Sequence, residues 1–214
     1  MAVRTHLLVM AKEPRPGFAK TRLMPAYDST AAAAVAAAAL ADTLRAVAAC
    51  SARRRIVAFA GLANGWVPSG FEVVPQSGET FNDRLAAAWD FAGAPGVQIG
   101  MDTPQVSSEL LDDALARVAR PDVDALLGLC PDGGWWAIGF RTPVAGAFDG
   151  VPMSRDDTGA RQLARLRELG LRVELLPELA DMDRPADLDA LRTAHPHLLV
   201  AQAAQRYAGD KVAP

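Results

Sequence analysis

Four cationic side chains are concentrated in one short stretch of the sequence, residues 11–25. They are Lys12, Arg15, Lys20 and Arg22. Three prolines stiffen this stretch, and Gly17 allows its backbone to approach a ligand closely. Four cations on a stiff loop suit a polyanion such as a nucleoside triphosphate. A solvated basic loop is the plainer alternative, because most charge runs only face water.

The basic loop is not a Walker A motif. That motif has a glycine directly before its lysine and another five residues earlier, whereas Ala19 and Pro14 stand at these positions. A prediction of phosphate binding therefore rests on the number of cations and on the position of the loop.

Two acidic segments are candidates for holding a divalent cation. Asp102 follows a short apolar run, and Pro104 fixes the turn after it. A carboxylate at the end of a strand suits a hard cation that keeps waters and shares phosphate oxygens, although it also suits a structural cap. In the second segment, period two places Asp181 and Asp183 on one face if the chain is extended. Asp187 lies near the start of a helix, where it offsets the helix dipole.

The sequence Pro131-Asp132-Gly133-Gly134 predicts a tight turn. In the strand that follows, Trp135 and Trp136 must face opposite sides of a sheet, so at most one belongs to the core. The other is expected to meet a ligand or a partner.

Short apolar runs predict a sheet with strands at residues 6–10, 56–60, 71–75, 97–101, 124–129, 135–140 and 171–176. Helix-forming segments predict helices at about residues 29–50, 80–91, 107–119, 157–169 and 185–194. This alternation indicates a parallel sheet covered by helices. No helix separates residues 124–129 from 135–140, so the sheet is expected to become mixed there.

We therefore predict a single-domain α/β fold, with residues 1–194 as the domain and residues 195–214 as a peripheral helix or tail. The net charge of −3 argues against a nucleic-acid partner. The two cysteines are far apart in the sequence, which favours reduced thiols and a cytoplasmic protein. No apolar run is read as a membrane span.

The spacing Lys12-x-Pro14-x-Pro16-Gly17-x-x-Lys20-Thr21-Arg22-Leu23 resembles the opening signature of a bacterial glycosyltransferase-like family, the radical-SAM/selenodomain-associated transferases. The family's Gly-x-Asp-(Ser/Thr)-Pro and Asp-x-Asp-(Thr/Arg)-Pro-x-Asp-Leu motifs match residues 100–104 and 181–188. It is similar in turn to the molybdopterin and phospholactate guanylyltransferases. The resemblance implies the Rossmann-like nucleotide-diphospho-sugar transferase (A-type glycosyltransferase) fold, with a mixed, mostly parallel central sheet.

The resemblance also implies a set of site residues. Asp102 and Asp183 would hold Mg²⁺ or Mn²⁺. The nucleotide would be bound by Lys12, Gly17, Lys20, Thr21, Arg22, Gln76, Gly78 and Arg84. The Gln76 amide suits hydrogen bonding to the edge of a nucleobase, because it can both donate and accept. The alternative for Gln76 is a polar residue that merely ends a strand. The alternative for Arg84 is a structural ion pair with an acidic neighbour. The glycines after Asp132 would let an acceptor lie against the backbone. Residues 153–155 depart from the family's Trp-Ser-Thr, so the acceptor is left open.

The leading prediction is a Mg²⁺-dependent nucleotidyltransferase that moves NMP from an NTP to a small phosphate- or phosphonate-bearing acceptor, with release of pyrophosphate. Lys20, Arg22 and Asp102 would serve catalysis. The first alternative is a glycosyltransferase that uses an NDP-sugar, with Asp132 as its base. The second is a non-catalytic nucleotide-binding module. A homodimer is one option for a protein partner.

Overall fold

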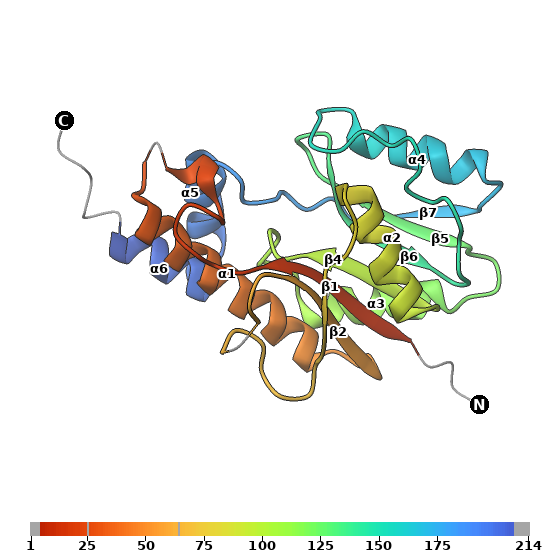
Figure 1. Cartoon of the computed structure of the whole chain (residues 1–214), viewed down its shortest axis with the longest axis horizontal. Helices are drawn as coiled ribbons and strands as arrows, with labels where there is room; N and C mark the ends of the chain where they lie inside the picture. Colours follow the sequence, from red (N-terminus) through yellow and green to blue (C-terminus); the bar gives the residue numbers. More distant parts are fainter. Residues whose placement is uncertain (1–4, 25, 64, 208–214) are drawn as a thin grey trace.

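The computed structural model describes residues 5–24, 26–63 and 65–207 (Figure 1). Its centre is a seven-stranded sheet in the order β3-β2-β1-β4-β6-β5-β7. The strands are β1 (His6–Lys12), β2 (Arg54–Ala60), β3 (Glu72–Pro75), β4 (Gly96–Gly100), β5 (Ala125–Leu129), β6 (Trp135–Phe140) and β7 (Val173–Leu176). The helices are η1 (Thr21–Leu23), α1 (Ser29–Ala49), α2 (Phe81–Ala92), α3 (Ser108–Val118), α4 (Thr158–Glu168), α5 (Pro185–Ala194) and α6 (Leu199–Tyr207).

All neighbouring strands are parallel except β6, which runs antiparallel to both β4 and β5. A tight turn leads into β6, in which Gly133 N donates to Cys130 O at 3.0 Å and Cys130 N donates to Gly134 O at 3.0 Å. The predicted mixed, mostly parallel sheet is confirmed, and its antiparallel member is the one that the missing helix indicated.

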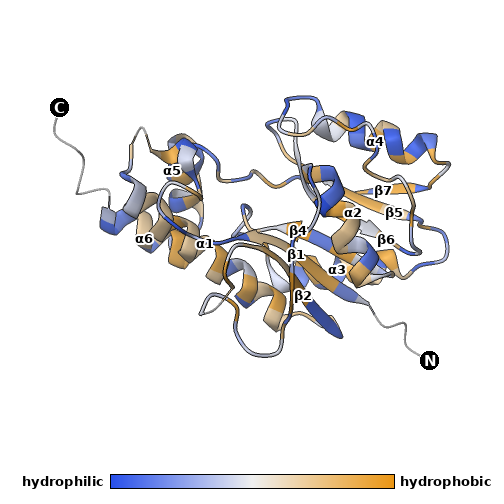
Figure 2. Cartoon of the chain, viewed as in Figure 1, coloured by the Kyte–Doolittle hydropathy of each residue, from blue (hydrophilic) through white to orange (hydrophobic). Residues whose placement is uncertain are grey.

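Two hydrophobic layers enclose the sheet because alternate residues of each strand point to opposite faces. Leu7 and Val9 of β1 pack in one cluster with residues of α1 and α3. Leu8 and Met10 pack in the other, which includes residues of α2 and α4. Figure 2 shows the mostly hydrophobic strands between these helices and the hydrophilic residues on α4.

A third cluster lies beside the sheet, where α5, α6 and the start of α1 come together on the left of Figure 1. It also contains Leu23 from the end of the basic loop and Met182 from the second acidic segment. The buried Asp42 carboxylate of α1 accepts from Val200 N at 2.9 Å, which ties α6 to α1. Of the stretch expected as a peripheral helix or tail, residues 199–207 form α6, and residues 208–214 lie outside the described part.

Helix α1 is the one helix among the described residues that is long and apolar enough to cross a membrane. The sequence interpretation missed this property because alanine, rather than larger apolar residues, supplies it. In the structure 61% of its most apolar stretch is buried inside the protein. Its small side chains, such as Ala36 and Ala39, instead allow close packing against the sheet and α6.

Capping residues fix where the helices that border the site begin. Thr80 and Asp83 form a reciprocal capping box at the start of α2, and Ser107 caps α3. Asp28 caps α1 by accepting from Ala31 N at 2.7 Å, so this helix begins at Ser29. Cys50 and Cys130 are both free and buried.

Candidate active site

A cleft of about 1000 Å³ opens at the carboxyl ends of β1 and β4. It is lined by the basic loop after β1, the loop after β4, the turn before β6 and the acidic segment after β7. The predicted site residues that line it are Lys12, Lys20, Thr21, Arg22, Gln76, Arg84, Asp102, Asp132 and Asp183. The structure thus brings together almost all of the predicted set.

Lys20 lies at the centre of this arrangement. It has a left-handed backbone conformation, with φ 52° and ψ 38°, and only 5% of the residue is exposed. Its Nζ lies 2.8 Å from Asp102 Oδ1 as an ion pair, donates to Asp183 Oδ1 at 3.3 Å and donates to the Met182 carbonyl oxygen. The sequence interpretation expected Lys20 to face phosphates, whereas here it holds the two candidate metal ligands together.

The charges of this group change its proton affinities. Burial alone would lower the pKa of the Lys20 ammonium, but the carboxylates of Asp102 and Asp183 outweigh burial and hold that pKa above its ordinary value. Burial alone would raise the pKa of Asp183, but Lys20 and Arg22 outweigh it and hold that pKa low. Both residues are therefore charged at neutral pH.

Asp183 is bound on both of its carboxylate oxygens. Arg22 Nη1 donates to Asp183 Oδ2 at 2.6 Å, although the Arg22 side chain remains 60% exposed. The backbone N–H groups of Asp183 and Arg184 donate to Asp187 Oδ2 at 3.2 and 2.7 Å. Asp187 thus shapes the start of α5, as its position in the sequence predicts.

The donor set suits a hard divalent cation. Asp102 and Asp183 turn carboxylate oxygens toward one position, and their segments are joined by a hydrogen bond from Met182 N to Asp102 O at 2.8 Å. Among the described residues no cluster of three or more His, Cys, Asp or Glu side chains forms a complete metal cage. Two carboxylates fit Mg²⁺, which commonly takes its other ligands from water and phosphate. The ammonium of Lys20 holds the cation position between them.

Asp181 belongs to the same site, although the sequence interpretation gave it no role. It lines the cleft, and its pKa is raised to about 6 because it is partly buried and lies near Asp132 and Asp183. The period-two spacing from Asp183 was the signal that could have identified it. Asp132 Oδ1 accepts from Gly134 N at 2.9 Å, so this carboxylate also stabilises its own turn.

Gln76 was expected to hydrogen-bond a nucleobase through both its amide N–H groups and its oxygen, but only the oxygen is free to do so. Its Nε2 donates to Ala11 O at 2.9 Å and to Ala58 O at 3.0 Å. Because both neighbours are carbonyl oxygens, the orientation of the amide is fixed and only Oε1 is left for a ligand.

Gly78 does not line the cleft, and a Cβ on it would come within 2.5 Å of the Asp83 Cβ. Its role is to pack the loop on the first turn of α2, where its carbonyl accepts from Arg84 Nε at 3.3 Å. Gly17 has a positive φ of 73° and no atom within 4 Å of a Cβ, so it permits a turn in the open basic loop. Arg15 does not line the cleft, but it stacks over Phe18, which does.

The glycines of the turn before β6 serve protein packing. A Cβ on Gly133 would lie 1.8 Å from Asp156 O, and Gly159 N of α4 donates to Gly133 O at 2.7 Å. The turn is therefore pressed against the start of α4, which leaves Gly134 to line the cleft. Gly133 does not line the cleft, so of the two glycines Gly134 is the one beside which an acceptor could lie.

The two tryptophans lie on opposite faces of the sheet, as predicted. Trp136 is 3% exposed, packs over Gly128 and donates from Nε1 to Pro177 O at 3.0 Å. Trp135 is partly buried against the other layer and borders the cleft.

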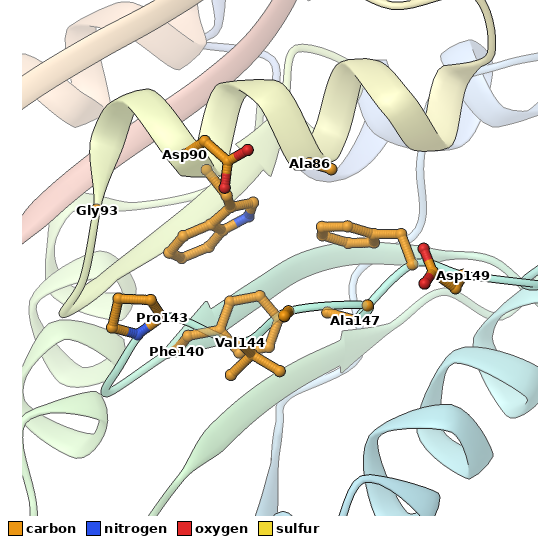
Figure 3. Close-up of a pocket in the computed structure, with 12 residues that line it drawn as sticks. Ala86, Asp90, Gly93, Phe140, Pro143, Val144, Ala147 and Asp149 are labelled. Atoms are coloured by element: carbon orange, nitrogen blue, oxygen red, sulfur yellow. The ribbon is translucent and has the colours of Figure 1, made fainter.

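A second pocket, of about 370 Å³, lies between α2 and residues 143–149 (Figure 3). Its lining is mostly apolar, with Phe140 and Val144 in its wall and the carboxylates of Asp90 and Asp149 beside it. It has no cationic lining residue, so it does not suit an anionic ligand.

The comparisons with known proteins identify the family and the fold of this chain. Residues 30–155, more than half of the chain, match the family described as "Uncharacterized protein conserved in bacteria (DUF2064)". The chain belongs to this family. The part matched in the DUF2064 family includes Gln76, Asp102 and Asp132, whereas the basic loop and Asp183 lie outside it. No protein of curated function matches the sequence.

The fold is similar to several solved transferases. A Desulfovibrio desulfuricans G20 protein assigned by inference as a nucleotide-diphospho-sugar transferase has a TM-score of 0.87 and 25% identity, covering 96% of this chain and 95% of that chain. A cytidylyltransferase from Leptospira borgpetersenii serovar Hardjo-bovis has a TM-score of 0.61 and 11% identity, covering 96% and 95%. A CMP:2-keto-3-deoxy-manno-octonic acid synthetase complexed with CTP has a TM-score of 0.59 and 11% identity, covering 91% and 99%. The predicted family and fold are confirmed, and the expectation of a transferase agrees with the class of all three neighbours.

Proposed function

We propose that this protein is a Mg²⁺- or Mn²⁺-dependent nucleotidyltransferase that transfers NMP from an NTP to a small acceptor with a phosphate or phosphonate group. The observation that carries the proposal is the meeting of Lys12, Lys20 and Arg22 with Asp102 and Asp183 around one cleft. Cations for a polyphosphate and carboxylates for a divalent metal lie within reach of each other.

The chain's own residues would bind and orient the donor. Arg22 is largely exposed, so it can turn from Asp183 to a terminal phosphate without leaving a buried charge behind. Lys12 lies at the end of β1 and also lines the cleft. Asp102 and Asp183 would hold the metal, which when bound would neutralise charge on the phosphate oxygens.

In the reaction, an oxygen of the acceptor phosphate attacks the α-phosphorus in line, and the bond to the β-phosphate oxygen breaks. Pyrophosphate leaves with the electron pair of that bond. A phosphate dianion needs no general base, so the protein contributes mainly positioning and charge stabilisation.

A glycosyltransferase that uses an NDP-sugar is the second candidate. The name of the Desulfovibrio neighbour favours it, at 25% identity over nearly the whole chain. A sugar hydroxyl would require a base, and Asp132 and Asp181 line the cleft where such a base would stand. A non-catalytic nucleotide-binding module is the least supported, because it does not explain why Asp102 and Asp183 lie together at the cleft.

A thermal-shift screen of the four common NTPs against NDP-sugars, each with and without Mg²⁺, tests the proposal. A donor at one hundred times its Kd should raise Tm by about 5–10 °C in a chain of this length. Metal-dependent stabilisation by an NTP supports nucleotidyl transfer, and pyrophosphate release with an acceptor would establish it. Stabilisation by NDP-sugars alone would favour the glycosyltransferase, and no response to either class would refute both.

A further inference from the structure

The side chain of Gln98 is a buried amide in the middle of the sheet. Its neighbours across the strands are Leu8 of β1 and Ile138 of β6, both fully buried and apolar. Gln98 is only 1% exposed, and its Oε1 has no hydrogen-bond partner. A buried polar group without a partner destabilises a protein, so its presence on a central strand requires an explanation.

The cleft reaches down to this residue. Gln98 is one of its lining residues, together with Met10, Gly100, Trp135 and Met153. Gly100 follows Gln98 on the same face of β4, and within 4 Å a Cβ on it would meet only Asp102 N, at 3.8 Å. The missing side chain therefore leaves open space above the sheet, and Gln98 lies at the floor of that space.

The floor of the cleft is polar but uncharged. Gln76, the other amide that lines the cleft, donates to two backbone carbonyls and is held on the β3 side of β1. Gln98 lies on the opposite side of β1, toward β6, with Trp135 and Asp132. Its neighbours Leu8, Ile138, Gly96 and Gly100 carry no charge that could compensate a buried ionic group. An uncharged ligand group that both donates and accepts hydrogen bonds would match the donor and acceptor atoms of the amide.

We propose that Gln98 is a specificity-determining residue that hydrogen-bonds a hydroxyl group of the acceptor. The acceptor class is then a hydroxylated small molecule whose carbon frame packs against Met10, Trp135 and Met153, while its phosphate lies toward Asp102. This inference rests on the proposed function and adds to it the non-reacting part of the substrate. It predicts that a hydroxyl-free acceptor is rejected, because the amide would remain unpaired.

The first test needs no ligand. Gln98→Met replaces the amide by an apolar side chain of similar volume, and it should raise Tm by about 2–4 °C because an unpaired buried group is removed. Gln162→Met is the matched control. Gln162 is also fully buried with an unpartnered Oε1, but its Nε2 donates to Ala147 O at 2.8 Å, so its replacement should lower Tm. A fall in Tm for Gln98→Met, or a rise for both variants, would overturn the proposal.

The second test compares glycerol 3-phosphate with propyl phosphate, which lacks the two hydroxyls. Calorimetric titration uses protein saturated with the α,β-methylene analogue of the NTP that the wild type binds best. The wild type should bind glycerol 3-phosphate at least about tenfold more tightly, and Gln98→Met should bind both probes about equally.

The two proposals fail in different ways. Wild-type protein that binds no NTP refutes the proposed function. Wild-type protein that binds NTP but does not distinguish the probes refutes only the role of Gln98. A Gln98→Met variant that loses affinity for the NTP itself assigns Gln98 to the nucleobase and overturns its assignment to the acceptor.

Discussion

Lys20 Nζ lies 2.8 Å from Asp102 Oδ1, so the centre of the basic loop is joined directly to the acidic loop after β4. The same ammonium reaches Asp183, and the two carboxylates thus share one buried cation. A lysine in this position compensates the charge of the site before any ligand binds.

Lys20→Met should destabilise the protein by about 1–3 kcal/mol at pH 7, because Asp102 and Asp183 lose the buried cation between them, although Asp183 keeps its contact with Arg22. The loss should shrink at pH 4, because removing Lys20 removes one of the charges that hold the pKa of Asp183 low. Urea unfolding of the variant and the wild type at both pH values measures it. Equal stability of the two proteins at pH 7 would show that Asp102 and Asp183 do not depend on Lys20.

Arg22→Ala should weaken NTP binding by one to two decades, since a charge-assisted contact to phosphate contributes about 1.5–3 kcal/mol. Arg22 is 60% exposed, so the stability should change little. Calorimetry with NTP, NDP and the matching NMP checks the assignment, and Arg15→Ala is the control because Arg15 itself does not line the cleft. An equal loss for all three nucleotides would mean that Arg22 does not contact the terminal phosphates.

Asp102→Asn and Asp183→Asn should each abolish the Mg²⁺-dependent part of NTP binding while the protein remains folded. Both carboxylates lie in loops beside the cleft rather than in the core, and an amide is a poor ligand for Mg²⁺. Thermal shift with NTP, with and without Mg²⁺, provides the readout. A variant that keeps the full metal dependence excludes its aspartate as a ligand.

His6 should make the stability depend on pH. Burial and, to a smaller extent, the Arg54 guanidinium lower the pKa of His6 to about 4, whereas an unfolded chain has about 6.5. Because the unfolded state binds the proton more tightly, stability should fall as pH falls from about 6.5 toward 4. At pH 5 the expected loss is about 2 kcal/mol. Urea unfolding at pH 7.5 and pH 5 should show a smaller pH effect in His6→Leu; an unchanged pH effect would contradict the assignment.

Gly133→Ala should destabilise the protein by about 2–4 kcal/mol, because its φ is +91° and the new Cβ would collide with Asp156 O. Gly150→Ala is the matched control, since Gly150 also has a positive φ, of 73°, but has open space around its Cβ. The control should lose only about 1 kcal/mol. Chemical unfolding measures both variants. Similar losses would show that backbone strain, rather than the contact with α4, explains the requirement for glycine.

The sequence was sufficient for the fold because each level of its pattern agreed. Alternation within the apolar runs assigned Leu7 and Leu8 to opposite layers, and the turn residues around Gly133 marked the one antiparallel strand. The positions of the motifs after the predicted strands also indicated which loops meet at the cleft. These features are local or depend only on the order of the elements.

The partners of individual side chains were not predictable in the same way. The pattern could not show that Lys20 turns to Asp102 or that Gln76 spends both amide hydrogens on carbonyls of β1 and β2, because such contacts depend on three-dimensional distances between distant segments. Gln98 gave no sequence signal, since a single polar residue in an apolar strand is ordinary at a strand edge. Only the central position of β4 makes it unusual.

The cluster formed by α1, α5 and α6 has a consequence for how the site opens. Leu23 and Met182 are anchored in it, and they lie close in sequence to Lys20 and directly before Asp183. If α6 detaches, the basic loop and the acidic segment lose the packing that holds Leu23 and Met182. The two hydrophobic layers on the faces of the sheet remain intact. Such an event is a local opening, with a free energy below that of global unfolding. Affinity for a ligand would then depend on how often α6 is docked, so a cavity at Val200 would weaken binding without touching the ligand.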